Sequence, residues 1–224
     1  IEAFKRQSDK YGYSLLFGSK NDRLKNDTFL EYFKYRCVDG IAIICTDPND
    51  KETLELIESD FPIVVIDMFN KNTSTVTSDN VQGCSLALNY LYKLGHRKIA
   101  HIQGVAQADN WPSSIRKKTY IEVMKKLNLD IPEGYIVDGV NFDVSGGYDA
   151  MKELLSLKDR PTAVFASGDK LAIGAVDAIK DAGLRVPEDI SVIGFDNIEI
   201  AKYVTPKLTT IRQNCQEIGK AAVD

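Results

Sequence analysis

The sequence has few of the side chains from which metal sites and catalytic centres are built. Its 224 residues include only two histidines and four cysteines. The cysteines form no C-x-x-C pair and the histidines lack helical i,i+4 spacing, so paired metal ligands are not expected. Scattered cysteines are usually small buried side chains of proteins in a reducing, cytoplasmic compartment. We therefore expect structural roles for all six residues, which are Cys37, Cys45, Cys84, Cys215, His96 and His101.

Long apolar runs and an excess of basic charge are also missing. No apolar stretch approaches the roughly 20 residues of a membrane-spanning helix, and residues 1–13 lack the apolar centre of a secretory signal. The net charge is -4, whereas nucleic-acid binding requires a dense basic footprint. We expect a cytoplasmic, globular chain that contacts neither a membrane nor DNA by itself.

Signatures of the common nucleotide-binding and hydrolytic enzymes do not occur. No strand pattern is followed by G-x-G-x-x-G, and G-x-x-x-x-G-K-[ST] is absent, which excludes the usual dinucleotide and P-loop sites. H-E-x-x-H, G-x-S-x-G and a recognisable Cys–His pair are missing too. Acid–base catalysis would then depend on carboxylates alone. The sequence predicts neither an enzyme nor a bound cofactor.

Strand and helix patterns alternate along the chain. Short apolar runs between turn residues predict strands at 13–17, 40–45, 62–67, 75–77, 98–103, 135–140, 161–166, 190–195 and 208–212. Apolar residues that recur on one face predict helices at 25–37, 50–59, 80–94, 113–128, 145–157, 169–182 and from about 215 onward. The strand runs are continuously apolar, which is typical of parallel sheets covered by helices on both faces.

The number of strands favours two sheets. About ten strands would be unusual in one small doubly wound sheet, so the predicted fold is α/β with two Rossmann-like lobes. Residues 1–11 look like the middle of a helix, and the chain stops within another helix. We therefore expect lobes that are truncated at both ends.

Signals at helix ends explain several conspicuous residues. Asp79 and Asp169 stand at the starts of predicted helices, where an aspartate commonly caps free backbone N–H groups. Gly95 is expected to end the helix 80–94. His96 follows directly, and we expect it to pack and form hydrogen bonds at a helix–strand junction.

Five stretches, in the same order along the chain, resemble the lac/galactose repressor family. They are SDNVQG at 78–83, LGHRKIA at 94–100, PTAVFASGDKLAIG at 161–174, VPEDISVIGFDN at 186–197 and PKLTTIRQ at 206–213. A single short match would be weak, but five in order extend over most of the chain. The chain thus resembles the effector-binding part of a LacI/GalR-type bacterial transcription regulator.

The resemblance implies a periplasmic-binding-protein-like fold with two lobes joined by a hinge. The N-terminal lobe would comprise residues 1–102 and 214–224, and the C-terminal lobe residues 103–213. A small molecule, which we expect to be a sugar, would bind in the interlobe cleft and shift the hinge equilibrium. That shift would control operator binding by an N-terminal helix-turn-helix head that this chain lacks. Such regulators are usually homodimers that read two-fold operators.

The general architecture suggests a first set of ligand residues. Ligands of open α/β sheets sit beyond the carboxyl ends of the strands. At the carboxyl ends of the predicted strands 13–17, 40–45 and 62–67 stand Ser19, Thr46 and Asp67. Asp196 stands at the end of the predicted strand 190–195. If two parallel-sheet lobes oppose each other, these positions face one cleft.

The family resemblance implies a second set of ligand residues. By this likeness, Arg116 matches a ligand-binding arginine, Phe142 an aromatic ring that stacks on the ligand, and Asp196 an acceptor of ligand hydroxyls. Gln213 matches a polar residue of a hinge strand. An arginine fork, a carboxylate and an aromatic face together suit a polyol. An arginine with a stacking ring also suits a purine, which is the alternative effector.

Other interpretations of these residues stay open. Arg116 could be a surface charge beside Lys117 and Lys118, and Phe142 could belong to the core. Many relatives carry Asn where this chain has Gly168, so we expect a bulkier or differently contacted ligand. Pro112 and Thr119 likewise replace the usual Ser and Gly of the arginine motif.

Two other protein classes are compatible with the same sequence. An extracytoplasmic sugar-binding protein of a transporter would share the fold and the cleft, although the stretches 94–100 and 186–197 look more like regulators. An α/β enzyme would use Asp67, Asp169 and Asp196 around a metal ion. The expected cap role of Asp169 and the lack of a catalytic frame oppose this class.

Overall fold

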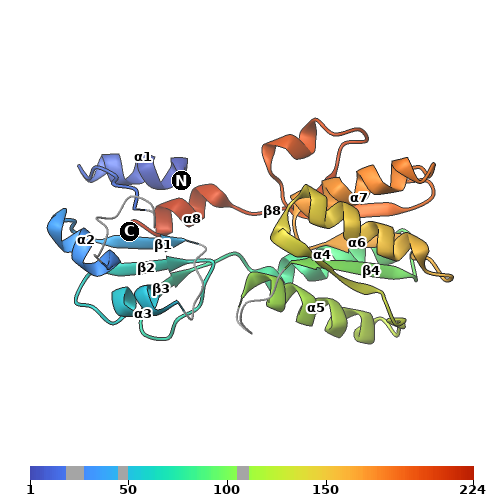
Figure 1. The fold of residues 1–224 in the computed structure, drawn as a ribbon, viewed down its shortest axis with the longest axis horizontal. Coiled ribbons are helices and arrows are strands. Elements are labelled where there is room, and N and C mark those ends of the chain that lie inside the picture. The colour runs from blue at the N-terminus through green and yellow to red at the C-terminus, as the bar shows by residue number, and fades with distance from the viewer. Residues whose placement is uncertain (19–27, 45–49, 105–110) are drawn as a thin grey trace. The chain divides into compact units, whose positions relative to one another are not determined.

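A computed structural model describes residues 1–18, 28–44, 50–104 and 111–224, which divide into two compact units (Figure 1). Unit 1 contains Ile1–Ser78 and Asn214–Asp224, and unit 2 contains Asp79–Gln213. The first boundary predicted from the sequence, between residues 102 and 103, is corrected to the step from Ser78 to Asp79. The reason is that α4 and β4, which the prediction gave to the first lobe, contribute to the core of unit 2.

Unit 1 is built on a small parallel sheet. Its strands pair in the order β1-β2-β3, and both pairs are parallel. The strands are β1 (Ile41–Ile44), β2 (Ile63–Ile66) and β3 (Ser74–Val76), and the helices are α1 (Glu2–Lys10), α2 (Phe29–Tyr35), α3 (Lys51–Ile57) and α8 (Cys215–Ala221). Buried side chains of β1, β2 and α3 form its apolar core.

Helices α1 and α8, which are far apart in the sequence, pack closely within unit 1. A Cβ added at Gly219 of α8 would lie 2.6 Å from the backbone nitrogen of Phe4 in α1. Nearby, the Gln7 amide donates a 2.6 Å hydrogen bond to the Asp224 carboxylate. The residues after 213 are therefore part of the packing of unit 1.

Two predicted elements of unit 1 differ from the structure. Residues 13–17 run as coil rather than as a strand, and the Phe17 side chain is 64% exposed. An apolar run becomes a strand only where a neighbouring strand supplies hydrogen bonds. The described sheet of unit 1 consists of β1, β2 and β3, and residues 13–17 do not pair with any of them. The helix predicted from residue 25 begins at Phe29, because Thr28 and Glu31 form a reciprocal capping box.

Unit 2 is a larger parallel sheet with helices on both faces. Its strand order is β5-β4-β6-β7-β8 and every pair is parallel. The strands are β4 (Ile99–Gly104), β5 (Ile136–Gly139), β6 (Ala163–Ala166), β7 (Ser191–Asp196) and β8 (Thr209–Arg212). The helices are α4 (Asn80–Lys93), α5 (Pro112–Lys126), α6 (Val144–Ser156) and α7 (Asp169–Asp181), with 3-10 turns η1 (Val140–Phe142) and η2 (Glu199–Lys202). The predicted class, α/β with two parallel sheets, is confirmed.

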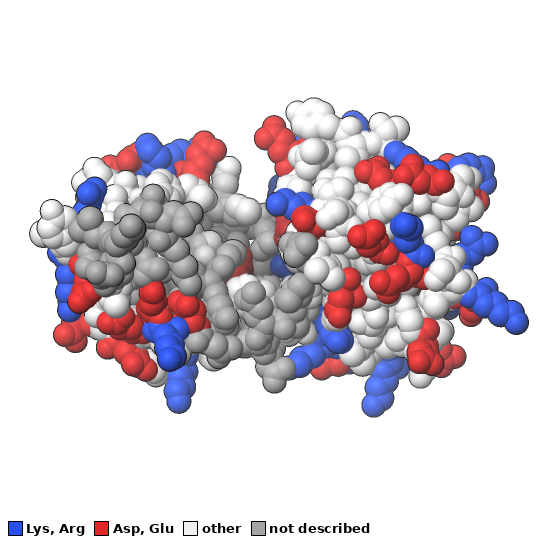
Figure 2. All heavy atoms as spheres, in the orientation of Figure 1, with Lys and Arg blue, Asp and Glu red and all other residues white. Residues whose placement is uncertain are grey.

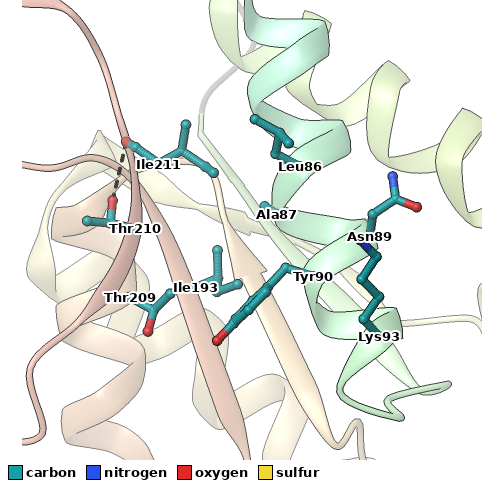
Figure 3. Close-up of a pocket in the computed structure, with 9 residues that line it drawn as sticks. All are labelled: Leu86, Ala87, Asn89, Tyr90, Lys93, Ile193, Thr209, Thr210 and Ile211. Carbon is teal, nitrogen blue, oxygen red and sulfur yellow. Dashed lines mark hydrogen bonds between the residues drawn. The ribbon is translucent and has the colours of Figure 1, made fainter.

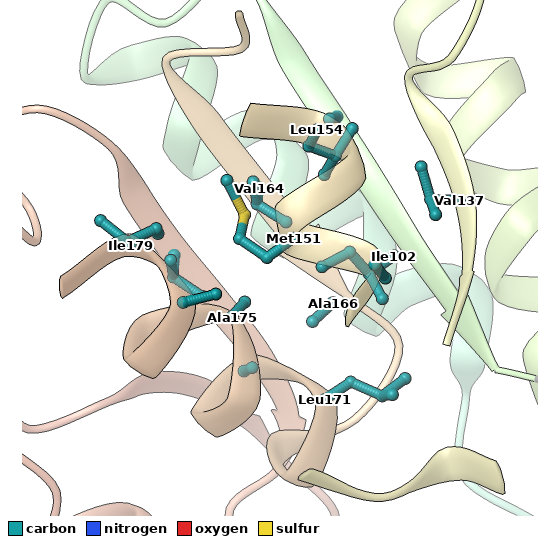
Figure 4. Close-up of a cluster of buried hydrophobic side chains, with 14 of the residues drawn as sticks. Ile102, Val137, Met151, Leu154, Val164, Ala166, Leu171, Ala175 and Ile179 are labelled. Carbon is teal, nitrogen blue, oxygen red and sulfur yellow. The ribbon is translucent and has the colours of Figure 1, made fainter. Parts of the chain in front are cut away.

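Each face of the unit 2 sheet buries an apolar cluster. Figure 4 shows the cluster formed with α6 and α7, in which Met151, Val164 and Ile179 interdigitate. The opposite cluster is formed with α4 and α5. Helices α6 and α7 approach so closely that a Cβ at Gly174 would lie 1.9 Å from the Val144 carbonyl oxygen. Glycine at this position permits the contact between the two helices.

The topology determines where unit 2 can bind a ligand. Strand β4 pairs with β5 on one side and with β6 on the other, so the strand order reverses between β4 and β6. Crevices form at the carboxyl ends of strands next to such a switch point. Gly104 ends β4 and Ser167 follows β6, so their surroundings are the first place to look. Among the described residues, no helix is long and apolar enough to cross a membrane.

The predicted roles of the cysteines and His96 are partly confirmed. Cys84 is fully buried, and burial raises the pKa of its thiol to about 12. Cys37 and Cys215 are exposed, so the expectation of burial is wrong for these two, and Cys45 lies outside the described residues. His96 bridges Thr162 and Ser191 with contacts of 3.0 and 3.1 Å, as expected at a helix–strand junction.

Candidate functional site

Four of the seven predicted ligand residues lie in unit 2, at or beyond the carboxyl ends of its strands. Arg116 belongs to α5, Phe142 to η1, Asp196 ends β7, and Gln213 follows β8. Asp67 lies in unit 1, directly after β2. Ser19 and Thr46 fall outside the described residues, so their predicted roles stay predictions.

Arg116 is buried and held by several groups. Only 4% of its side chain is exposed, which overturns the interpretation as a surface charge. Its Nε donates a 2.8 Å hydrogen bond to Asn80 Oδ1, and its Nη1 donates to the carbonyl oxygen of Ser167. The guanidinium carbon lies 3.7 Å from the centre of the Phe195 ring. A buried charge requires such compensation, so the fold holds this guanidinium in one place.

Asp196 stands beside Arg116 at the end of β7. Its Oδ1 lies 3.7 Å from Arg116 Nη1, and its side chain is 23% exposed. Gln213 Nε2 donates a 2.5 Å hydrogen bond to the same carboxylate. Asp196 and Asn197 have positive φ angles of 112° and 56°, and such strain in a residue other than glycine is concentrated at functional sites. The structure therefore brings Arg116, Asp196 and Gln213 together, and their role in ligand binding stays a prediction.

The Phe142 ring covers two glycines of neighbouring strand ends. A Cβ at Gly104 would lie 2.2 Å from Phe142 Cδ2, and one at Gly168 would lie 2.6 Å from Phe142 Cζ. Phe142 is half-buried against the core formed with α6 and α7. The Phe142 ring therefore fills the space that a Cβ atom at residue 168 would need, and this explains why residue 168 is glycine.

Asp169 does not have its predicted role as a helix cap. It is the first residue of α7, and the capping position is Gly168, which makes no side-chain cap. The Asp169 carboxylate is fully buried and accepts hydrogen bonds from the Ile198 N–H (2.8 Å) and the Thr210 hydroxyl. Burial raises the pKa of this carboxyl group. Asp169 therefore joins α7 to the segment after β7 and to β8. The cap predicted for Asp79 is confirmed, since its carboxylate accepts a 2.8 Å hydrogen bond from the Gln82 N–H of α4.

Asp67 is held by its own unit. It has a φ of 56°, and its carboxylate accepts a 3.1 Å hydrogen bond from the Thr77 hydroxyl. The metal-site hypothesis requires Asp67, Asp169 and Asp196 to share one ion. Both carboxylate oxygens of Asp169 already accept hydrogen bonds from protein groups, and this arrangement does not favour that hypothesis.

Reasoning from the sequence missed the groups that hold Arg116. Asn80 is buried and accepts from Arg116 Nε, and Ser167 supplies the second carbonyl acceptor. Asn80 directly follows Asp79 in the stretch SDNVQG at 78–83, for which the sequence predicted only the cap role of Asp79. Ser167 lies beside Gly168 in the stretch 161–174, so both Asn80 and Ser167 are direct neighbours of residues that the sequence analysis singled out.

A shallow groove lies elsewhere on unit 2. It has a volume of about 330 Å³ and is lined by Leu86, Ala87, Asn89, Tyr90, Lys93, Ile193, Thr209, Thr210 and Ile211, which Figure 3 places on α4, β7 and β8. The predicted ligand residues are not among its lining. On the described face in Figure 2, basic and acidic side chains are interspersed over unit 2.

Comparisons with known proteins identify the family of this chain. The periplasmic binding protein-like domain family matches residues 88–224. The ribose operon repressor of Escherichia coli K12 is 37% identical over 229 residues, covering 100% of this chain and 68% of the repressor. The chain belongs to the LacI/GalR family of transcription regulators.

Other members of the family are similar to this chain in sequence and in structure. The HTH-type transcriptional repressor PurR of Klebsiella pneumoniae is 37% identical over 228 residues, covering 99% of this chain and 66% of that repressor. The crystal structure of a LacI-family regulatory protein from Chloroflexus aggregans superposes with a TM-score of 0.86 at 29% identity, covering 99% of this chain and 80% of that one. The chain thus spans about two thirds of the length of these repressors.

Proposed function

We propose that this chain is the effector-sensing part of a LacI-type repressor and that its effector is a small sugar. The observation that carries the proposal is the buried Arg116 guanidinium beside the partly exposed Asp196 carboxylate, 3.7 Å apart at the end of β7. A guanidinium and a carboxylate held in fixed positions offer donors and acceptors to neighbouring hydroxyl groups.

The chemistry of the remaining residues supports a sugar. The Phe142 ring is half-buried and is proposed to cover the C–H face of the sugar ring. Gln213 holds the Asp196 carboxylate through its amide. Asp67, Thr46 and Ser19 are the proposed contacts from unit 1. The 37% identity to a ribose operon repressor supports a pentose as the first candidate.

A purine-type base is the second candidate effector. Arg116 can hold the edge of a planar base, and Phe142 can stack on its face. The repressor PurR is as similar to this chain, at 37% identity, as the ribose operon repressor. Identity alone therefore does not separate the two candidates.

The remaining parts of the proposal concern the whole regulator. Effector binding shifts a conformational equilibrium that is transmitted to a helix-turn-helix head, which binds operator DNA. The protein acts as a homodimer in the cytoplasm and performs no catalysis. The named relatives are repressors, which supports this part of the proposal.

A ligand screen of the protein tests the effector. Thermal unfolding is measured with D-ribose, other sugars, sugar phosphates and purines. A ligand present at 100 times its Kd raises the free energy of unfolding by about 2.7 kcal/mol. We expect a shift with a sugar, and we expect Asp196→Asn to abolish it.

The matched control is Asp130→Asn, since Asp130 is an exposed aspartate beyond α5. This variant should respond to the sugar like the unsubstituted protein. A shift with purines alone would replace the sugar by the second candidate. A sugar response that survives Asp196→Asn would contradict the proposed site.

A further inference from the structure

A histidine lies in the core of unit 2, behind the proposed site. His101 of β4 is fully buried, and its ring stacks with the rings of Tyr120 and Phe165, with 5.0 Å between the ring centroids in each pair. An apolar side chain at this position would have no polar atoms that need hydrogen-bond partners, whereas histidine has two ring nitrogens. The polar atoms of this imidazole therefore require partners.

The partners of His101 determine which of its nitrogens carries the proton. Nδ1 lies 2.9 Å from the carbonyl oxygen of Phe165, which can only accept, so Nδ1 carries hydrogen. Burial lowers the pKa of His101 to about 4, so the ring is neutral near pH 7. Nε2 is therefore an acceptor, and the Ser167 hydroxyl, 3.3 Å away, donates to it.

Ser167 connects this histidine to Arg116. Ser167 is fully buried, its N–H donates to the Ile102 carbonyl at 2.8 Å, and its hydroxyl donates to His101. Its own carbonyl oxygen accepts from Arg116 Nη1. The orientation of Ser167 and of the peptide group that follows it thus depends on bonds to two other elements: β4, through Ile102 and His101, and α5, through Arg116.

We infer that His101 is a positioning residue of the effector site, which holds the Arg116 guanidinium through Ser167. The role in effector binding rests on the proposed function, whereas the positioning of Arg116 does not. Ser167 accepts from Arg116 through its carbonyl oxygen and donates to His101 through its hydroxyl, so we expect His101 to act on Arg116 through Ser167. Coupled hydrogen bonds of this kind change together when one member is removed.

Three variants test the connection. His101→Phe keeps a stacked ring but removes both hydrogen bonds, and Ser167→Ala removes only the hydroxyl. His101→Gln can still donate to the Phe165 carbonyl and accept from Ser167, so it serves as the rescue variant. If His101→Phe folds poorly, Ser167→Ala still interrupts the same connection with the loss of one atom.

The first readout is the NMR resonance of the Arg116 Nε–H, assigned by its loss in Arg116→Lys. We expect hydrogen exchange of this group to be about tenfold faster in His101→Phe and in Ser167→Ala, and to return to within about twofold in His101→Gln. A resonance and an exchange rate that are unchanged in both disrupting variants would overturn the inference. This measurement needs no effector.

The second readout is the Kd for D-ribose. We expect each disrupting variant to weaken binding about tenfold and the double variant to be no weaker than either single one, because both interrupt the same connection. If the increases in Kd of the two single variants multiply in the double variant, the inference that His101 acts through Ser167 is wrong. If the unsubstituted protein binds no sugar, the proposed sugar effector fails and the exchange measurement alone decides the inference.

Discussion

At the scale of single residues, buried polar groups create measurable pH dependence. The folded pKa of His101 is about 4 against an ordinary value of 6.5. Because the folded pKa is depressed, the contribution to stability is complete above pH 6.5 and is lost as pH falls toward 4. Besides burial, the charges of Lys117 and Arg116 lower this pKa.

We therefore expect the free energy of unfolding to fall by roughly 3 kcal/mol more in the unsubstituted protein than in His101→Phe between pH 7 and pH 4. Urea unfolding at a series of pH values measures the difference. All other ionisable groups are the same in both proteins, so their contributions cancel in the comparison. Parallel pH profiles would contradict the buried, neutral state of His101.

Gly168 provides a second test at this scale. A Cβ there would lie 2.6 Å from the Phe142 ring, so Gly168→Ala must displace the ring or strain the chain. We expect the variant to lose about 1–3 kcal/mol of stability by overpacking and to shift the Phe142 ring resonances. In combination with Phe142→Leu, the cost should decrease. Full stability of Gly168→Ala would show that the ring is not confined there.

At the scale of elements, the contact between α6 and α7 depends on a glycine. A Cβ at Gly174 would lie 1.9 Å from the Val144 carbonyl oxygen, and backbone atoms cannot yield as a flexible side chain can. We expect Gly174→Ala to cost more than about 3 kcal/mol in the free energy of unfolding, although alanine is the better helix former.

Asp177→Ala is the matched control for this prediction, since Asp177 is an exposed residue of the same helix. It should change stability by less than about 0.5 kcal/mol. Chemical denaturation of both variants makes the comparison. Equal stability of the two variants would mean that α6 and α7 can separate at little cost.

At the scale of the whole molecule, the two units differ in how the chain builds them. Unit 2 is one continuous segment, Asp79–Gln213, with an apolar cluster on each face of its sheet. Unit 1 needs α8 from the end of the chain to pack against α1.

We expect a fragment of residues 79–213 to fold alone, with cooperative thermal unfolding and a slowly exchanging Arg116 Nε–H. A fragment of residues 1–78 should lack cooperative unfolding, because it lacks α8. Circular dichroism and hydrogen exchange measure both. A non-cooperative fragment 79–213 would mean that its core depends on unit 1.

Apart from the strand predicted at residues 13–17, the order of strands and helices was readable from the sequence, and so were their parallel pairing and the family. These features depend on local patterns: continuous apolar runs, cap residues such as Asp79, and motifs that stay contiguous in the chain. The stretch 186–197 pointed to Asp196, and the likeness to the family's arginine motif pointed to Arg116. Each of these signals lies within a short stretch, so no knowledge of distant contacts was needed.

Only the tertiary structure decided what those residues touch. Residues 13–17 are apolar yet remain coil, because a strand depends on a partner elsewhere in the chain. Asp169 joins α7 to Thr210 rather than capping its own helix. Arg116 is held through Ser167, and Ser167 through His101. These contacts unite residues from different strands and helices, and sequence spacing carries no information about such distances.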